Sequence, residues 1–410
     1  MEVLHPICCG LDIHKASIQA CLLTSDAAGR AHRELRRFST MTSDILAMAD
    51  WLRAAGCLAI AMESTGSYWL PIWNLLEDEF ALLLVNATHV KRVPGRKTDV
   101  KDAEWLADLL RHGLLPASLV LERGERELRE LTRYRTTLVQ ERAAEVNRLQ
   151  KTLEGANIKL GAVASEVLGK SGRAMVEGLI AGEDDPAVLA ELAQGQLRHK
   201  LEPLRLALEG RVGPHQRFLL GQQLTHIDQL TTLIETLSSE IEARLAPFAD
   251  LVTRLDAIPG IGVWTAQVLL AELGTDMTRF PTAKHLASWV GICPETRESG
   301  GARHSGHIGQ GNNWVRTALV EAGYAAGRSK HTYLGAQYHR LKPRLGHKRA
   351  TIAVGHSILV SVYHMLARGT AYHDLGADYL QGLNHEVATR RLVRRLERMG
   401  HTVIIEPVAS

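Results

Sequence analysis

The chain has 410 residues, and its 48 lysines and arginines nearly balance its 45 aspartates and glutamates, for a net charge of +3. This length favours two or three domains with a sizeable core. The small net charge excludes attraction of nucleic acid by the charge of the whole protein, so nucleic acid would have to bind at local basic patches. The five cysteines form no CxxC pair, which argues against a disulfide framework and a structural zinc site. The N-terminus has no leader pattern and no apolar run reaches the length of a membrane span, so we expect a soluble cytoplasmic protein with no membrane partner.

The first predicted domain, residues 1–120, alternates short β-rich runs with amphipathic stretches, which is the pattern of an α/β fold. Helices are expected to start near Thr42, Ser67 and Thr98. Three strands in succession, followed by alternating helices and strands, predict a mixed sheet. The expected strands are ICCGLDIH (7–14), SIQACLLT (17–24), HRELRRFST (32–40), CLAIAME (57–63) and FALLLVNA (80–87).

Residues 121–248 predict two long helices, at about 125–157 and 215–246. In the second helix, leucine and isoleucine recur at steps of three or four, which is the spacing of a coiled-coil seam: Leu220, Leu224, Ile227, Leu230, Ile234, Leu237, Ile241 and Leu245. The two helices predict an antiparallel arm or an oligomerisation element. An ordinary helical bundle is the alternative.

The third predicted domain, residues 249–410, reads as all helical, with glycine-rich loops at 291–311 and a basic tail. Its segment LDAIPGIG, residues 255–262, has the spacing of a helix-hairpin-helix. In such a turn Gly260 and Gly262 would let backbone N–H groups approach a phosphate without regard to base sequence. The alternative is a tight turn with no ligand.

Two aspartates stand three positions apart in RKTDVKDAEWLADLLRHG, residues 96–113. Asp99 and Asp102 would occupy the first turn of a helix, so both carboxylates would face the same side. Two further acids lie in the same α/β region, Asp12 within the first apolar strand and Glu63 at the end of a later one.

A carboxylate in an apolar strand is costly unless a cation compensates it. Four such acids can hold two hard divalent cations through oxygen ligands, as phosphodiester chemistry requires, and we expect Mg²⁺ with Mn²⁺ as a second candidate. The alternative is structural, with Asp12 and Glu63 paired to Lys15 or Arg96 and with Asp99 as a capping residue.

Basic residues stand directly before the paired aspartates. These side chains can hold a phosphate backbone while the neighbouring acids bring metal to it: Lys91, Arg92, Arg96 and Lys97. Two further basic segments, 339–349 and 389–398, are either solvated helix faces or nucleic-acid contacts.

A candidate nucleophile lies in the second glycine-rich loop, where Ser299 is followed by two glycines and then by Arg303. Such a serine can attack a phosphodiester and hold the DNA end as a phosphoserine ester, with Arg303 stabilising the pentavalent charge. Ser305 is an equally plausible hydroxyl. A tyrosine nucleophile is a further alternative, because three suitable residues are close together in the sequence: Arg328, His331 and Tyr333.

The motifs together resemble the DEDD insertion-sequence transposases of the IS one-ten family, and most closely its IS eleven-eleven branch. The N-terminal part is similar to a RuvC-like, RNase H-fold domain through GLDIHK, MESTGSYW and VKRVPGRKTDVKDAEWLADLLRHGLL. The C-terminal part is similar to the second transposase domain through IPGIGVWTAQVLLAELG, FPTAKHLASWVGICP, RESGGARHSG and GNNWVRTALVEAG. The chain departs from the family pattern where it reads GHIGQGNN, because relatives commonly carry basic residues before this GN.

The resemblance implies an acidic tetrad at Asp12, Glu63, Asp99 and Asp102 and a serine nucleophile at Ser299. It also implies a prokaryotic, nucleoid-associated recombinase that excises and inserts its own element, pairs a guide RNA from that element with donor and target DNA, and assembles through dimers into a tetramer. Two other functions stay open from the residues alone. The first is a metal-dependent nuclease of the Holliday-junction-resolvase type, without a serine adduct, and the second is a nucleic-acid-binding protein without catalysis.

Overall fold

The computed structural model describes residues 3–25, 30–63, 66–86, 102–293, 297–299, 302–304, 309, 311–379 and 385–404. The chain divides into two compact units, Met1–Arg123 and Gly124–Ser410.

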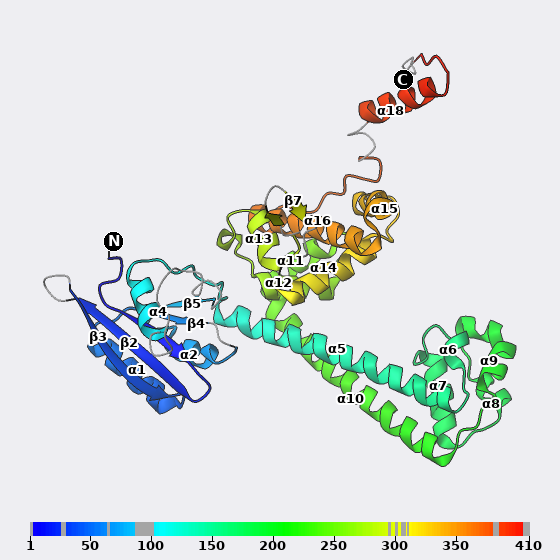
Figure 1. The fold of residues 1–410 in the computed structure, drawn as a ribbon. Coiled ribbons are helices and arrows are strands. Elements are labelled where there is room, and N and C mark those ends of the chain that lie inside the picture. Colours follow the sequence, from blue (N-terminus) through cyan, green and yellow to red (C-terminus); the bar gives the residue numbers. More distant parts are fainter. Residues whose placement is uncertain are drawn as a thin grey trace. The chain divides into compact units, whose positions relative to one another are not determined.

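The first unit is a five-stranded mixed sheet in the order β3-β2-β1-β4-β5, which confirms the predicted sheet and matches the RNase H-like strand order (Figure 1). β1 pairs antiparallel with β2, and β2 with β3, while β1, β4 and β5 run parallel. Parallel neighbours need crossover helices, and these follow β3 and β4 in the chain. The strands are β1 (Cys8–Ile13), β2 (Ser17–Ser25), β3 (Ala31–Ser39), β4 (Ala59–Glu63) and β5 (Ala81–Val85), and the helices are α1 (Thr42–Ala54), α2 (Trp69–Leu76) and α4 (Asp102–Arg111).

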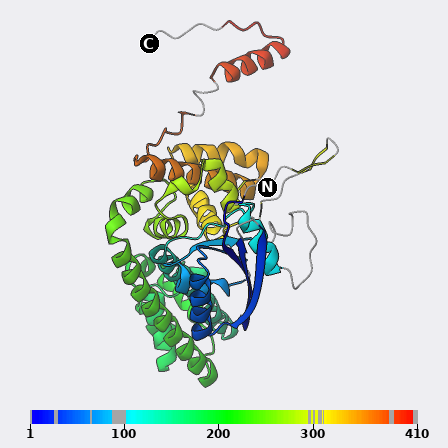
Figure 2. The ribbon, with the colours of Figure 1, turned by 90° about the vertical axis from the view of Figure 1, so that its left-hand side faces the viewer.

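Each face of this sheet has its own core, because side chains alternate along a strand. Leu11, Ile60 and Met62 belong to the core on the face covered by α1 and α2. Cys8 and Ala61 belong to the other core, which includes the buried leucines of α4. Figure 2 shows α1 and α4 on opposite faces of the twisted sheet.

The second unit begins with an antiparallel arm made by α5 (Arg123–Gly155) and α10 (Pro214–Leu245), which lie side by side in Figure 1. Three contacts fix the direction, because they pair rising numbers on α5 with falling numbers on α10: Glu127 with Arg244, Arg142 with Thr231, and Thr152 with Gln223. Of the eight residues in the predicted seam, seven are buried and Leu237 is half-buried, so the seam packs against α5 of the same chain.

Short helices close the arm at its far end and share a core with Leu149, Leu153 and Leu220 of the long helices. These are α6 (Leu160–Val163), α7 (Lys170–Ala181), α8 (Pro186–Glu191), the 3₁₀ helix Gly195–Lys200 and α9 (Leu201–Leu208).

The rest of the second unit is helical, as predicted, with one short hairpin that the sequence did not predict. Its helices are the 3₁₀ helix Ala246–Phe248, α11 (Ala249–Asp256), α12 (Val263–Leu273), the 3₁₀ helix Met277–Arg279, α13 (Ala283–Val290), α14 (Asn313–Ala326), α15 (Tyr333–Leu345), α16 (His347–Arg368) and α18 (His385–Arg398). The hairpin joins β6 (Arg297–Ser299) to β7 (Ala302–His304).

The expectation that no apolar run reaches the length of a membrane span was wrong for α16. This helix of 22 residues is long and apolar enough to cross a membrane by length and composition alone. The structure gives another reason for its composition, because α16 packs against α13, α14 and α15 and buries residues such as Val354, Ile358 and Val362. A central core helix has the same apolar character as a short span.

Candidate active site

Two of the four predicted acids belong to one face of the sheet, and a third lies at the start of the helix that covers this face. In β1, Asp12 follows Cys8 and Gly10 at steps of two, on the face that α4 covers. In β4, Glu63 likewise follows Ala59 and Ala61. Because side chains two positions apart on a strand share a face, both acids belong to the α4 face.

The pairing of the strands also brings the two acids to the same level. The parallel register runs from Cys8 with Ala59 to Leu11 with Met62. Asp12 and Glu63 are the next residues on these neighbouring strands, which lie about 4.8 Å apart. They therefore stand beside one another at the carboxyl ends of β1 and β4.

The third acid, Asp102, is the first residue of α4. Gly10 fixes how closely this helix approaches β1, because a Cβ there would lie 2.5 Å from Ala107 N and would also overlap Ala103 O. Only a residue without a side chain permits such contact between helix and strand backbones. The close contact brings the first turn of α4, with Asp102, onto the sheet face that carries Asp12 and Glu63.

The side chains as they stand do not form a closed metal cluster. Within the described ranges, no group of three His, Cys, Asp or Glu side chains is placed to hold a metal ion. Asp12 is 20% exposed and its Oδ2 lies 3.2 Å from His14 Nε2. Asp99 and the basic residues Lys91, Arg92, Arg96 and Lys97 lie outside the described residues. The donor set, with carboxylate oxygens alone, fits a hard divalent cation such as Mg²⁺.

The candidate nucleophile belongs to the short hairpin of the second unit. Ser299 is the last residue of β6 and pairs with Ala302, so it stands at the start of the turn. Arg303, on β7, pairs with Glu298, one position further from the turn.

A buried ionic network lies where the loop after this hairpin ends. Glu272 of α12 is fully buried and accepts two hydrogen bonds from Arg133 of α5, from Nε at 2.6 Å and from Nη2 at 2.9 Å. Arg129 adds a contact at 3.3 Å, and burial lowers its pKa against the opposing effect of the Glu272 charge. Asn312 Nδ2 donates to Glu272 Oε2 at 2.7 Å.

The same asparagine begins α14. Asn312 Oδ1 accepts from the backbone N–H groups of Trp314 and Val315, which is a typical N-cap. Glu272 therefore connects the arm to the residue that ends the loop after Ser299. Sequence reasoning missed this network, although a single acid inside the apolar run VWTAQVLLAELG was a usable signal.

The predicted hairpin glycines differ in their surroundings. Gly260 has a φ of +94°, and a Cβ there would lie 2.7 Å from Ala326 N of α14, so this glycine serves helix packing. Gly262, the N-cap of α12, has no atom within 4 Å of the corresponding position. Of the two glycines, Gly262 is therefore the one with open space beside it.

The residues of the tyrosine alternative have other partners. Arg328 lies over the ring of Tyr324 at 4.3 Å, and its hydrogen bond and charge lower the pKa of that phenol. The Tyr333 backbone N–H donates to Asp374 Oδ1 at 3.0 Å, and His331 adopts a φ of +66°. These contacts belong to the N-terminus of α15 and the turn before it, and they give Arg328, His331 and Tyr333 structural roles.

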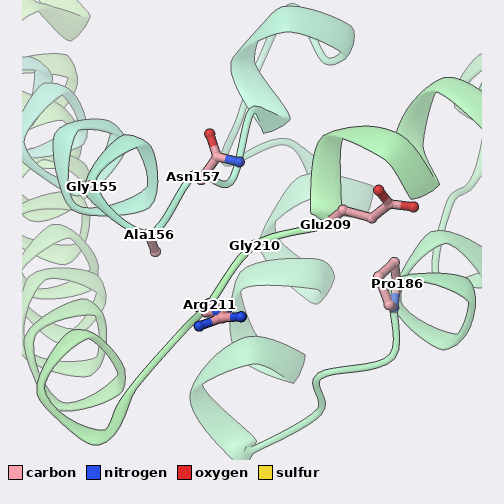
Figure 3. A pocket seen from close by; sticks show the side chains of 7 residues that line it. All are labelled: Gly155, Ala156, Asn157, Pro186, Glu209, Gly210 and Arg211. Carbon is pink, nitrogen blue, oxygen red and sulfur yellow. The ribbon is translucent and has the colours of Figure 1, made fainter.

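A wide hollow of about 600 Å³ lies at the far end of the arm, between the end of α5, the start of α8 and the segment after α9. Figure 3 shows its lining, in which the charged side chains are Glu209 and Arg211. Both are exposed, and Gly210 packs against Ala156 and Ile158. The hollow contains no buried polar group that would select a ligand.

Comparison with known proteins finds a transposase family that matches the N-terminal part of the chain and another that matches the C-terminal part. Residues 9–158 match the DEDD transposase family of IS110, and residues 252–340 match the family described as "Transposase IS116/IS110/IS902 family". The chain is 30% identical, over 307 residues, to the insertion element IS110 uncharacterized 43.6 kDa protein of Streptomyces coelicolor, covering 68% of this chain and 73% of that relative. It is 24% identical, over 264 residues, to the transposase for insertion sequence element IS1328 of Yersinia enterocolitica, covering 64% and 69% of the two chains. Together with the RNase H-like sheet, these matches show that the chain belongs to the IS110 family of transposases, with a DEDD domain and a second transposase domain.

Proposed function

We propose that this transposase excises and inserts its element by metal-dependent, serine-mediated strand cleavage and exchange. The observation that supports this most is the meeting of Asp12, Glu63 and the first turn of α4 at one end of one sheet face. The motifs RESGGARHSG and GNNWVRTALVEAG support a further placement in the IS eleven-eleven branch.

The acids would hold the metal. Asp12, Glu63, Asp99 and Asp102 supply only oxygen ligands, which suits Mg²⁺ and also Mn²⁺. A bound divalent cation polarises the phosphate and stabilises charge on the leaving oxygen. His14, 3.2 Å from Asp12 Oδ2, orients that carboxylate.

The serine would carry out the exchange. Ser299 Oγ attacks the phosphorus as its proton passes to a base, a new Oγ–P bond forms, and the bond from phosphorus to the leaving sugar oxygen breaks. Arg303 lies on the paired strand of the same hairpin and is the proposed donor to the developing charge. The reverse attack, by a sugar hydroxyl of another DNA end, releases the serine and completes the exchange.

DNA is the substrate that a transposase implies. We propose in addition that an RNA from the element guides the choice of DNA, that copies assemble as dimers and tetramers, and that the protein acts in the cytoplasm on the chromosome. Lys91, Arg92, Arg96, Lys97 and Gly262 are the proposed backbone contacts, because cations and free backbone N–H groups hold phosphates without reading sequence.

The decisive experiment incubates the full-length protein, co-expressed with its element flanks, with labelled element-end DNA and Mg²⁺. We expect a covalent protein–DNA adduct that maps to Ser299, and its loss in Ser299→Ala, in Asp12→Asn and in Asp102→Asn. A Ser299→Ala variant that still cleaves would instead identify a resolvase-type nuclease. Binding by all variants, with no cleavage by the wild type, would identify a protein without catalysis.

A further inference from the structure

A cavity of about 320 Å³ lies between α5, α12 and α14 of the second unit, apart from every residue assigned above to chemistry. Its volume falls in the range of about 300–1,000 Å³ that is typical of small-ligand sites. The aromatic walls are Trp264 and Trp314, and Val139, Val268 and Ala318 complete the apolar part.

A buried arginine borders this cavity. Arg135 of α5 is only 1% exposed, and its Nη1 donates to Gln267 Oε1 at 2.7 Å. Its Nε and Nη2 are buried and have no hydrogen-bond partner among the described residues, where no ion pair of Arg135 occurs either. Burial lowers the pKa of this guanidinium to about 10. Because these atoms are buried, the guanidinium stays behind the cavity wall, where it contacts Gln267 and the ring of Trp264.

The two tryptophans present aromatic surfaces, each with a guanidinium near one ring face. Arg135 Cζ lies 4.2 Å from the ring centroid of Trp264, and Arg133 Cζ lies 5.5 Å from that of Trp314. Trp264 is nevertheless 45% exposed, so its indole is available for stacking. Exposed aromatic rings backed by arginine are typical of sites that stack unpaired nucleic-acid bases.

The polar lining suits the edge of a base better than a phosphate. Gln140 and Asn313 each offer both donors and acceptors, as the edge of a base requires. Glu321, an exposed carboxylate in the lining, would repel a phosphate but accept from the amino group of cytosine or adenine. The charges therefore favour a base inside the cavity and its phosphates outside.

The cavity also lies close in sequence to the proposed chemistry. Asn313 and Trp314 follow Asn312, the residue that ends the loop after the Ser299 hairpin. An enzyme that exchanges strands has to unpair bases near the cleaved phosphodiester, and a pocket that holds one such base recovers part of the unstacking energy.

We propose that this cavity receives one unpaired base of the DNA strand that the transposase cleaves. The base stacks on the exposed face of Trp264, its edge meets Gln140 and Asn313, and Arg135 supports the indole from the opposite face. This inference rests on the proposed strand-cleavage function, but binding alone tests it.

The test measures the affinity of the full-length protein, by fluorescence anisotropy, for three DNA duplexes. The first is fully paired, the second has one unpaired 2-aminopurine, and the third has an abasic residue in place of that base. We expect the wild type to prefer the unpaired base to the abasic residue by about 5- to 150-fold, which is the range for stacking one base on an aromatic ring. We also expect quenching of 2-aminopurine fluorescence on binding.

The variants separate this site from general DNA binding. Trp264→Ala should remove the preference, Trp264→Phe should retain most of it, and Arg135→Met should reduce it. The matched control is Phe218→Ala, which removes an aromatic ring that is 68% exposed on the arm and should leave the preference unchanged.

Equal wild-type affinity for the unpaired base and the abasic residue would overturn the inference while leaving the proposed function intact. Full preference in Trp264→Ala would do the same. The same three duplexes are also measured as RNA, and a preference for the unpaired base in RNA alone would overturn the assignment to a DNA strand. Failure of the wild type to bind any duplex would overturn the proposed function itself.

Discussion

Glu272 offers the sharpest test of how the arm supports the C-terminal helices. The change Glu272→Gln keeps the shape of the side chain but removes its charge, so Arg133 and Arg129 lose their shared counter-charge. Glu272 is fully buried, whereas the side chain of Arg133 is 36% exposed and part of its charge can be solvated. Removing one partner of a buried ion pair costs about 3–5 kcal/mol, and the exposure of Arg133 favours the lower end, about 3 kcal/mol.

For the second unit, Gly124–Ser410, a loss of about 3 kcal/mol corresponds to a fall of about 5 °C in the melting temperature, because the unfolding entropy of about 2.1 cal/mol/K per residue grows with length. Differential scanning calorimetry measures this fall, and Glu240→Gln is the matched control. Glu240 also pairs with an arginine, Arg244 at 2.7 Å, but is half exposed, so its loss should cost less than about 1 kcal/mol. Equal melting temperatures for Glu272→Gln and the wild type would refute the reasoning that this ionic network stabilises the packing of α12 against α5.

Three further outcomes follow from the structure. Gly10→Ala should destabilise the first unit by about 1–3 kcal/mol in urea unfolding, because its methyl group meets the backbone of α4. The control Gly124→Ala should not destabilise the protein, because no atom lies within 4 Å of the added methyl group. Equal unfolding midpoints for Gly10→Ala and the wild type would contradict the close contact between β1 and α4. Changing Lys91 and Arg92 to Gln should lower the slope of log Kobs against log salt for duplex DNA by about 1.8, and an unchanged slope would remove both residues from the interface. Below pH 9 a thiol reagent should modify Cys293 before the other four cysteines, because Cys293 is only half-buried and the other four are buried. Burial raises the pKa of all five thiols, to about 12 for Cys8, to about 11 for Cys21 and Cys57, and well above the ordinary value for Cys9, so these four form thiolates only at higher pH. Mass spectrometry showing early modification of Cys8 would contradict this burial.

The elements that could be predicted were those with a local signal. The short β-rich runs at 7–14 and 57–63 predicted strands, and the register then brought Asp12 and Glu63 to neighbouring positions. The seam of α10 followed from its spacing, although spacing alone did not decide whether it packs within one chain or between copies. The β6–β7 hairpin was missed because three-residue strands contain too few residues to show a period.

The features that could not be predicted depend on contacts between distant segments. Gly260 was predicted to bind phosphate from a local motif, and that motif contained no sign of the close contact with α14, which lies more than fifty residues later. The cavity at Arg135 joins three helices that are separated in the chain, so no window of sequence contains it. Burial of a charge is likewise a tertiary property, and the sequence around Arg135 resembles any charged helix.

The antiparallel arm begins and ends at nearly the same place. Glu127, near the start of α5, pairs with Arg244, near the end of α10, at 3.0 Å, so the 116 residues between them leave and return to one point. The arm is therefore a loop with adjacent ends, and its length does not change the distance between the start of α5 and the end of α10. Evolution or an engineer can therefore lengthen or shorten it by matched whole turns of both helices, and so alter its reach while the rest of the second unit keeps its packing.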